Sequence, residues 1–354
     1  MDANRNQSVL FLDKVFLRPR KQNLRGVELF NLSLIRDLAR EGIKLTVPIH
    51  HSWKSAVLDG LSGLLPELCE TDRRNTPLNG LQAVWRLRGR SYDKVILANV
   101  ANGLTPALWL LRLFQGRRPL IMFAHRMPPR RFLAALPWRA EKVVPVNGII
   151  ANCFRKAGYA GIHEIFGHID AGRFYPAGQR PTPDKINFCV VGFLDNAWKG
   201  ADTAVAAFRK MPEEVRAKSI LHLSSFRSPP SFPEPNIRAA EWMPVGRMPE
   251  WLRGMDVMIV PSRDEGVMRE TFSLTMVEGM LTGLPILASN LPVLAEKIDA
   301  GGGYVFNTVE DLARLMTNLA RDAGLRARLG AQARAIALER YIWDTRRFIS
   351  RCLA

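Results

Sequence analysis

The chain has 354 residues, 47% of them hydrophobic, which suits two folded α/β domains. Its first residues are polar, and no stretch reaches the roughly 18 continuous apolar residues of a spanning helix. We therefore expect no signal peptide and no membrane span, and we place the protein in the cytoplasm. The four cysteines are far apart and form no C-x-x-C pair, which gives no basis for a zinc site or a disulfide framework.

The positive charge is unevenly distributed. The formal net charge is +17, and residues 1–178 hold 27 Lys and Arg against 13 Asp and Glu, whereas residues 179–354 hold 23 and 20. Such an excess indicates an anionic partner: a membrane surface, a phosphorylated acceptor or nucleic acid. Because no nucleic-acid-binding module is recognisable, we expect no nucleic-acid partner. The alternative is that Arg-rich composition merely follows a GC-rich genome.

Short apolar runs alternate with amphipathic stretches along the first half of the chain. This alternation predicts a parallel sheet that is covered by helices on both faces. The predicted strands are 8–13, 43–49, 94–100, 120–124 and 148–151, and the predicted helices are 27–40 and 106–114.

The alternation restarts after a Pro- and Gly-rich stretch at 177–184, which we interpret as a linker. We therefore predict two Rossmann-like domains, 1–178 and 179–340, with 341–354 packing back on the first. Doubly wound sheets bind ligands at the carboxyl ends of their strands, so we expect a cleft between those ends. In the second half, strands are predicted at 186–193, 220–224, 257–260 and 286–288, and helices at 201–211, at 271–281 and twice between 309 and 339.

The most informative segment is PSRDEGVMRETFSLTMVEGMLTGLPILAS, residues 261–289. A buried strand leads into an acidic loop, and a helix is predicted from Thr271. Glu270 lies just before that helix, and Glu278 lies two turns inside it. A helix start offers free N–H groups and a positive dipole end to a diphosphate. Carboxylates beside it can accept hydrogen bonds from sugar hydroxyls.

The run E-T-F-S-L-T-M-V-E resembles the E-x7-E motif of retaining glycosyltransferases with the GT-B fold, family 4 (group 1) in particular. The resemblance covers most of the chain and implies two Rossmann-like domains that face each other across a cleft. It implies that Glu270 contacts the donor sugar, that Glu278 binds the nucleotide ribose, and that the backbone of Thr271, Phe272 and Ser273 contacts sugar or phosphate. Ser273 stands where the family commonly has Gly. The alternative is a capped helix with two solvated glutamates.

A second stretch of the resemblance begins at Gly192. The family often reads G-R-L followed by K-G, with the Arg and the Lys facing the diphosphate. Lys199 keeps the second of these charges, whereas Phe193 replaces the first. Arg263 or Arg269 are candidates for the missing charge. The alternative for Lys199 is an ordinary surface residue before a helix.

Two weaker matches lie in the first half. Arg25 and Gly26 open the run R-G-V-E, which resembles the family's G-G-x-E turn, where backbone amides approach the diphosphate or the acceptor. A plain tight turn is the alternative. His125 follows the strand LIMFA, where the family frequently has a His that touches the donor sugar. The alternative there is a strand-end histidine whose partner is the backbone.

The resemblance implies transfer of a hexose-type sugar, with retention, from a nucleotide-diphosphate sugar to an acceptor in bacterial-type surface polysaccharide, lipopolysaccharide or glycolipid synthesis. Glu270, Lys199 and His125 are the expected catalytic residues, with Glu270 in a positioning role. The sequence has no Asp-x-Asp, which fits metal-independent chemistry without a cofactor. The alternatives are a catalytically silent scaffold that binds nucleotide sugar or membrane, and a sugar-nucleotide epimerase of the same fold.

We expect the acceptor, a glycan or lipid-linked molecule, to bind the first domain. The basic candidates are Arg25, Arg126, Arg130 and Arg131. The segment 128–141 mixes Arg with Phe, Leu and Trp, as interfacial helices do. Our hypothesis is that it docks on the anionic inner face of the plasma membrane. An ordinary helix at the wall of the cleft is the alternative.

Overall fold

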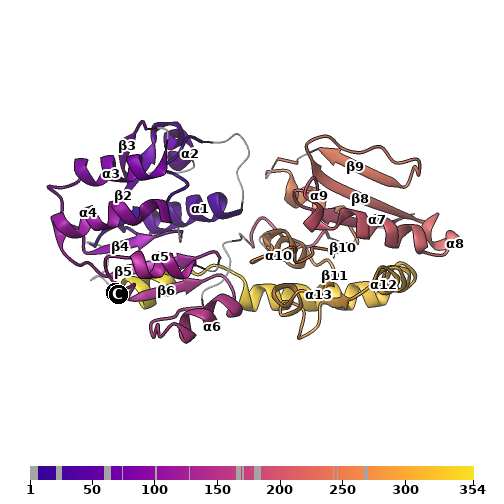
Figure 1. Cartoon of the computed structure of the whole chain (residues 1–354). Helices are drawn as coiled ribbons and strands as arrows, with labels where there is room; N and C mark the ends of the chain where they lie inside the picture. Colours follow the sequence, from indigo (N-terminus) through magenta and orange to yellow (C-terminus); the bar gives the residue numbers. More distant parts are fainter. Residues whose placement is uncertain are drawn as a thin grey trace. The chain divides into compact units, whose positions relative to one another are not determined.

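The chain divides into two compact units (Figure 1). The first unit comprises Met1–His168 and Trp343–Ala354, and the second comprises Ile169–Ile342, so the change of unit lies ahead of the predicted boundary at 178. The computed structural model describes residues 7–20, 26–59, 65–73, 75–99, 102–126, 128–164, 169, 171–178, 185–241, 243–244, 246–266 and 270–354.

The first unit is built on a parallel six-stranded sheet with the order β3-β2-β1-β4-β5-β6. Its strands are β1 (Ser8–Leu12), β2 (Lys44–His50), β3 (Glu67–Thr71), β4 (Lys94–Leu97), β5 (Leu120–Ala124) and β6 (Lys142–Pro145). Its helices are α1 (Gly26–Arg40), α2 (Lys54–Leu58), α3 (Thr76–Arg86), α4 (Thr105–Gln115), α5 (Arg130–Ala135) and α6 (Gly148–Lys156), with short 3-10 turns η1 (His51–Trp53) and η2 (Asn102–Leu104).

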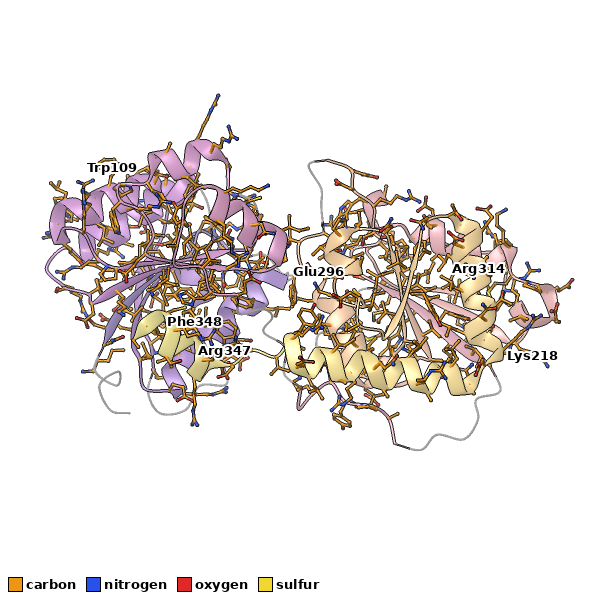
Figure 2. All side chains as sticks on the ribbon, turned by 90° about the horizontal axis from the view of Figure 1, so that it is seen from below. Trp109, Lys218, Glu296, Arg314, Arg347 and Phe348 are labelled. Carbon is orange, nitrogen blue, oxygen red and sulfur yellow. The ribbon has the colours of Figure 1, made fainter. Side chains whose placement is uncertain are left out.

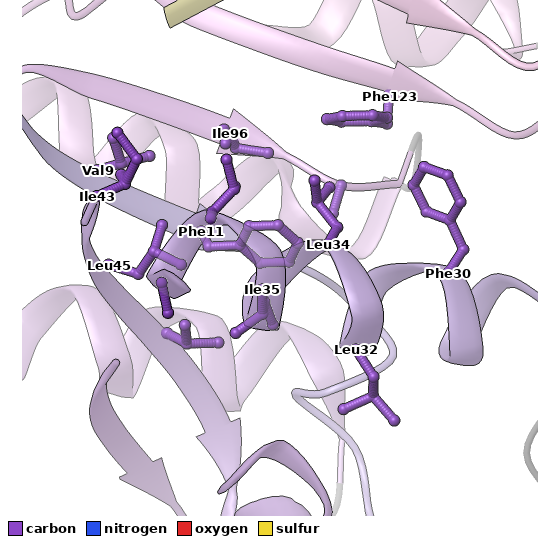
Figure 3. Close-up of a cluster of buried hydrophobic side chains, with 14 of the residues drawn as sticks. Val9, Phe11, Phe30, Leu32, Leu34, Ile35, Ile43, Leu45, Ile96 and Phe123 are labelled. Atoms are coloured by element: carbon purple, nitrogen blue, oxygen red, sulfur yellow. The ribbon is translucent and has the colours of Figure 1, made fainter. Parts of the chain in front are cut away.

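One core of this unit lies between the sheet and α1, as Figure 3 shows in close-up. Phe11 and Phe123 from the strands share this core with Phe30 from the helix, and the Phe30 and Phe123 ring centres are 5.7 Å apart. The C-terminal segment joins the same core. Helix α14 (Thr345–Phe348) and the π-helical turn η4 (Ile349–Leu353) place Phe348 5.3 Å from the Phe123 ring.

The second unit repeats the architecture with the order β12-β11-β10-β7-β8-β9, again parallel throughout. Its strands are β7 (Ile186–Val191), β8 (Ser219–Phe226), β9 (Ile237–Glu241), β10 (Val257–Val260), β11 (Ile286–Ser289) and β12 (Gly303–Phe306). Its helices are η3 (Ala197–Lys199), α7 (Ala201–Lys210), α8 (Glu213–Arg216), α9 (Met248–Arg253), α10 (Leu274–Leu281), α11 (Pro292–Ala295), α12 (Val309–Arg321) and α13 (Ala323–Arg340).

The strand predicted at 148–151 is wrong, because these residues begin helix α6. The side chain of Asn147 accepts a hydrogen bond from the N–H of Ile150 at 2.8 Å and so caps the helix. The neighbouring strand is β6, which ends at Pro145. The apolar run G-I-I-A is the buried face of a helix, which a window of four residues cannot distinguish from a strand.

The segment 128–141, where membrane docking is hypothesised, is not one continuous helix. Only α5, Arg130–Ala135, is helical, and the aromatic side chains of the segment are buried. Phe132, Leu136 and Trp138 are buried, and the Trp138 indole donates to the carbonyl of Arg118 at 2.8 Å. Burial of these side chains stabilises the first unit and leaves them unable to enter a bilayer. None of the helices in the described parts of the chain has the length and apolarity to traverse a membrane.

Candidate functional site

The centre of the site is an ion pair at the carboxyl edge of the second sheet. Lys199 Nζ lies 2.6 Å from Glu270 Oε2, and the side chains are only 14% and 10% exposed. Ser262, two residues after β10, donates its hydroxyl to the same carboxylate oxygen at 3.2 Å. A charged hydrogen bond in this sheltered position is stronger than a surface ion pair, because water screens it less.

Two glycines fix the position of Lys199. Gly192, directly after β7, has φ 155°, and a Cβ there would lie 3.3 Å from Lys199 Cε. Gly200 has φ 69°, and a Cβ there would lie 2.0 Å from the carbonyl oxygen of Pro261. Both the left-handed backbone and the close approach to β10 therefore require glycine at position 200. The lysine ammonium also lies 4.4 Å from the centre of the Trp198 ring.

Helix α10 begins three residues later than predicted, at Leu274. Thr271 and Phe272 precede it, and Ser273 forms its N-cap with φ 61° and ψ 70°, in the left-handed region. Its buried hydroxyl has no hydrogen-bond partner among the described residues. The first turn of α10 follows Glu270 in the sequence. Its backbone N–H groups have no partner within the helix, which makes them suitable for binding an anion.

Glu278 lies inside α10 and is half-buried. Burial raises its pKa to about 7, and the positive charge of Arg173 partly offsets this rise. A carboxyl in this environment ionises near neutral pH, when it becomes a strong acceptor for hydroxyl groups.

A second cation lies behind the loop that carries Glu270. Lys297, directly after α11 and Glu296, is fully buried, and its ammonium lies 4.6 Å from the Phe272 ring centre and 5.0 Å from that of Tyr341. It donates to the carbonyl of Val293 at 3.0 Å. Burial lowers its pKa to about 8, and the negative charge of Glu270 acts in the opposite direction. Sequence reasoning missed this residue, although a lysine within an apolar stretch was a usable signal.

The two arginines considered as replacements for the charge missing at Phe193 have different outcomes. Arg263 forms an ion pair with Asp202 of α7 at 2.7 Å, which holds its guanidinium on that helix. Arg269 lies outside the described residues. Lys297 is the one buried Lys or Arg among the described residues of this unit, and its Nζ also lies 3.7 Å from Glu296 Oε1.

His125 belongs to the first unit, where it follows β5 and packs edge-on against Phe30 with ring centres 4.9 Å apart. Burial lowers its pKa to about 4, despite a hydrogen bond to the backbone of Ala98. Its Nε2 atom has no partner among the described residues. The imidazole is therefore neutral at physiological pH and retains one ring nitrogen for further hydrogen bonding.

The remaining predicted residues of the first unit are dispersed. Gly26 is the first residue of α1, and Arg25 lies outside the described residues. Arg126 is exposed after β5, and its charge contributes to lowering the pKa of Lys14, which follows β1. Arg130 and Arg131 are exposed at the start of α5. In the described parts of the chain, no group of three or more His, Cys, Asp or Glu is placed to hold a metal ion.

Comparison with known proteins assigns the second unit. Residues 185–322 match the family model described as Glycosyl transferases group 1. Over these residues the chain is similar to the group 1 glycosyltransferases. A D-inositol 3-phosphate glycosyltransferase of Xylanimonas cellulosilytica is 30% identical over 167 residues, which is 41% of this chain. The matched region is about a third, 36%, of that relative's own length.

Solved structures extend the likeness to the whole chain and identify its fold as GT-B. Anabaena Alr3699/HepE, in complex with UDP and glucose, superimposes with a TM-score of 0.71 at 15% identity, covering 95% of this chain and 96% of that one. The lipopolysaccharide outer core galactosyltransferase WaaB gives a TM-score of 0.69 at 11% identity, with 98% and 99% covered. The predicted α/β class and GT-B architecture are thus confirmed.

Within this glycosyltransferase domain, the ion pair and both E-x7-E glutamates lie in the matched range. The same range contains Lys297, which lies beneath Phe272 of the motif. The four residues Lys199, Glu270, Glu278 and Lys297 therefore all lie within one contiguous family match.

Proposed function

We propose that the protein transfers a hexose-type sugar from a nucleotide-diphosphate sugar to an acceptor, with retention of anomeric configuration. The observation that carries this proposal is the pair Lys199–Glu270, held at the carboxyl edge of a group 1 glycosyltransferase domain. The pair offers a cation for the diphosphate and a carboxylate for sugar hydroxyls, which are the two recognition groups that such a donor needs.

In the proposed reaction the bond between sugar C1 and the diphosphate oxygen breaks, and negative charge grows on the leaving diphosphate. Lys199 and the N–H groups at the start of α10 stabilise this charge, since they are fixed before the reaction begins. Glu270 orients the sugar, and Glu278 accepts hydrogen bonds from the ribose hydroxyls. The leaving phosphate takes the acceptor proton as the new C1–oxygen bond forms on the same face.

The proposed chemistry needs no metal, because Lys199 and helix α10 meet the charge of the diphosphate. We assign His125 a hydrogen-bonding role toward the donor sugar, which its neutral imidazole and buried Nε2 support. Gly192 gives the diphosphate and Lys199 room, as the absence of a side chain there allows.

We further propose an acceptor in bacterial-type surface polysaccharide, lipopolysaccharide or glycolipid synthesis, used at the inner face of the plasma membrane. The first unit holds 29 Lys and Arg against 13 Asp and Glu, so it carries +16 of the formal +17. A unit of this charge attracts phosphorylated acceptors and anionic lipids. The likeness to WaaB, a lipopolysaccharide outer core galactosyltransferase, supports this acceptor class.

A thermal-shift screen tests the donor assignment. The protein is heated with UDP, GDP, ADP, CMP and their common sugar conjugates, beside Glu278→Ala and the exposed control Glu339→Ala. A ligand at 100 times its Kd adds about 2.7 kcal/mol to the free energy of unfolding. We expect one nucleotide class to raise the Tm of the wild type and of the control only. No shift with any nucleotide contradicts the proposal, and conversion of the donor sugar without an acceptor identifies an epimerase instead.

A further inference from the structure

Four large apolar side chains are exposed on helices α3 and α4 of the first unit. Leu78 and Trp85 on α3 are 50% and 56% exposed, and Trp109 and Leu113 on α4 are 51% and 76% exposed. We call these four residues the apolar face. Figure 2 shows Trp109 at the outer side of its unit. Exposed tryptophans and leucines that gather on one surface mark an interaction site, whereas single ones are ordinary.

The two helices form one surface because they pack closely along their length (Figure 1). Near their first turns, a Cβ on Gly80 would lie 3.0 Å from Ala107 Cβ. Near their last turns, the rings of Trp85 and Phe114 are 5.7 Å apart. The indole N–H of Trp109 donates to the carbonyl of Ala135 at 3.1 Å, so α5 continues the surface on the α4 side.

The chain segment that carries the apolar face is poor in acidic residues, although Asp72, just ahead of it, accepts a hydrogen bond from Gln82 of α3 at 3.0 Å. From Arg73 to Ala140 the sequence has 13 Lys and Arg and a single acidic residue, Asp93. Two of the arginines stack on the exposed tryptophans: Arg88 lies 4.9 Å from the Trp85 ring centre, and Arg112 lies 5.4 Å from that of Trp109. The exposed arginines that we call the basic rim are Arg86, Arg88, Arg117, Arg130 and Arg131.

We propose that the apolar face and the basic rim dock the protein on an anionic phospholipid bilayer. Tryptophan prefers the boundary between headgroups and acyl chains, because its ring is apolar and its N–H is polar. Leu78 and Leu113 enter the acyl region, and the guanidinium groups bind headgroup phosphates. Exposed leucines distinguish this surface from a nucleic-acid site, where aliphatic side chains have no comparable partner.

This inference rests on the proposed use of a membrane-associated acceptor, and it specifies the surface. The hypothesis drawn from the sequence placed docking on 128–141, in which Phe132, Leu136 and Trp138 are buried. The docking surface instead lies on α3 and α4, and only Arg130 and Arg131 of that earlier segment contribute to it.

Vesicle flotation of the full-length protein tests the proposal. The vesicles contain phosphatidylethanolamine with phosphatidylglycerol, or phosphatidylcholine alone. We expect binding to the anionic vesicles only. This binding should decrease strongly between about 0.05 and about 0.5 M NaCl, because the Debye length shortens and salt screens the charges of the basic rim. Equal binding to both vesicles, or no binding to either, overturns the proposal. Binding to RNA without binding to anionic vesicles points to a nucleic-acid surface and also overturns it.

Matched variants locate the contact. The double variant Trp109→Ser/Leu113→Ser should lower the vesicle partition coefficient at least about tenfold, whereas Leu338→Ser, an exposed leucine of the second unit, should not. Arg130→Glu/Arg131→Glu should weaken binding as well, whereas Arg328→Glu of the second unit should have little effect. Unchanged binding in both double variants contradicts the assignment of the surface.

Two further measurements distinguish loss of the docking surface from misfolding and from failure of the proposed function. Tryptophan fluorescence of the wild type should be quenched by brominated anionic lipid, and the quenching should decrease in Trp85→Phe/Trp109→Phe. The nucleotide-induced thermal shift should persist in every surface variant, which demonstrates folding. A variant that loses vesicle binding but keeps the nucleotide-induced thermal shift tests the docking surface alone. If the wild type shows no nucleotide-induced shift, the proposed function is rejected, and the vesicle result is then judged by itself.

Discussion

Lys199 and Glu270 are 71 positions apart in the sequence, yet the lysine Nζ lies 2.6 Å from the glutamate Oε2. Gly192 and Gly200 hold the lysine on one side, and Ser262 holds the carboxylate on the other. In the proposed function, a nucleotide-sugar donor separates this pair, with its diphosphate on Lys199 and its sugar hydroxyls on Glu270. The pair therefore links donor recognition to the alignment of the sugar.

Removal of the carboxylate should affect turnover more than nucleotide affinity. We predict that Glu270→Ala lowers kcat about 100-fold, because the sugar loses its orientation relative to the leaving group. Release of nucleoside diphosphate from the matching donor, measured with acceptor present, checks this. The Kd for the free nucleotide should change little, since the nucleotide has no sugar to contact Glu270. Near wild-type turnover would remove Glu270 from the site.

Gly200 should not tolerate a side chain. In Gly200→Ala the new Cβ would approach the Pro261 carbonyl and the residue would keep a positive φ, so we expect a loss of at least about 2 kcal/mol in the free energy of unfolding. Urea denaturation measures it. Gly89→Ala is the matched control, because a Cβ there meets nothing within 4 Å. Equal stability of the two variants would contradict the described turn.

Ser273 holds a left-handed N-cap conformation that glycine adopts at lower cost. We predict that Ser273→Gly raises the free energy of unfolding by about 0.5–1 kcal/mol, since a strained backbone is relieved. Differential scanning calorimetry should show a small increase in Tm. A decrease would mean that the buried serine hydroxyl contributes more to stability than the strain costs.

Lys297 should give the protein a pH-dependent stability. Its pKa is about 8 in the folded protein, against 10.5 for an ordinary lysine, so the unfolded chain binds more protons between these pH values. The free energy of unfolding should then rise with pH from about 8 to about 10.5, by up to about 3 kcal/mol from this group. Below pH 8 both states are protonated and the cost of the buried charge is fully present.

Urea denaturation of the wild type and Lys297→Met at several pH values measures this contribution. The methionine variant should be more stable relative to the wild type at pH 7 than at pH 9.5, because only the wild type recovers stability as its lysine loses the proton. A stability difference between the two proteins that is independent of pH would show that Lys297 keeps an ordinary pKa.

Glu278 should make nucleotide binding sensitive to pH near neutrality. Its pKa of about 7 means that the carboxylate, the stronger acceptor for ribose hydroxyls, is lost as the pH falls below 7. We predict that nucleotide affinity decreases by up to about tenfold per pH unit below 7, while Glu278→Gln shows weak binding at all pH values. Calorimetric titrations between pH 5.5 and 8 test this, and a flat wild-type profile would contradict it.

The sequence predicted the parts of the site that lie within short motifs. The E-x7-E run and the K-G pair indicated Glu270, Glu278 and Lys199, because their residue types and spacing are local features. The contact between Lys199 and Glu270 depends on the packing of β7 against β10, which no local pattern contains.

The same limit explains what the sequence left out or placed wrongly. Lys297 lies beside the Phe272 and Tyr341 rings through tertiary packing, so the sequence could signal a buried lysine but not these contacts. The segment 128–141 looked amphipathic, but tertiary burial of Trp138 overrode that pattern. Trp85 and Trp109 lie in helices whose burial pattern depends on the helices beside them.

The most direct test of the donor site is a calorimetric comparison of Lys199→Met with Lys218→Met, using the nucleotide diphosphate identified by thermal shift. Lys218 is an exposed lysine just before β8, at the opposite edge of the same sheet, and serves as the control for loss of one positive charge. The account predicts that Lys199→Met raises the Kd at least about tenfold, as loss of one charged hydrogen bond requires, and that Lys218→Met leaves it unchanged. An equal Kd for both variants would contradict the assignment of Lys199, and with it the donor site at the carboxyl edge.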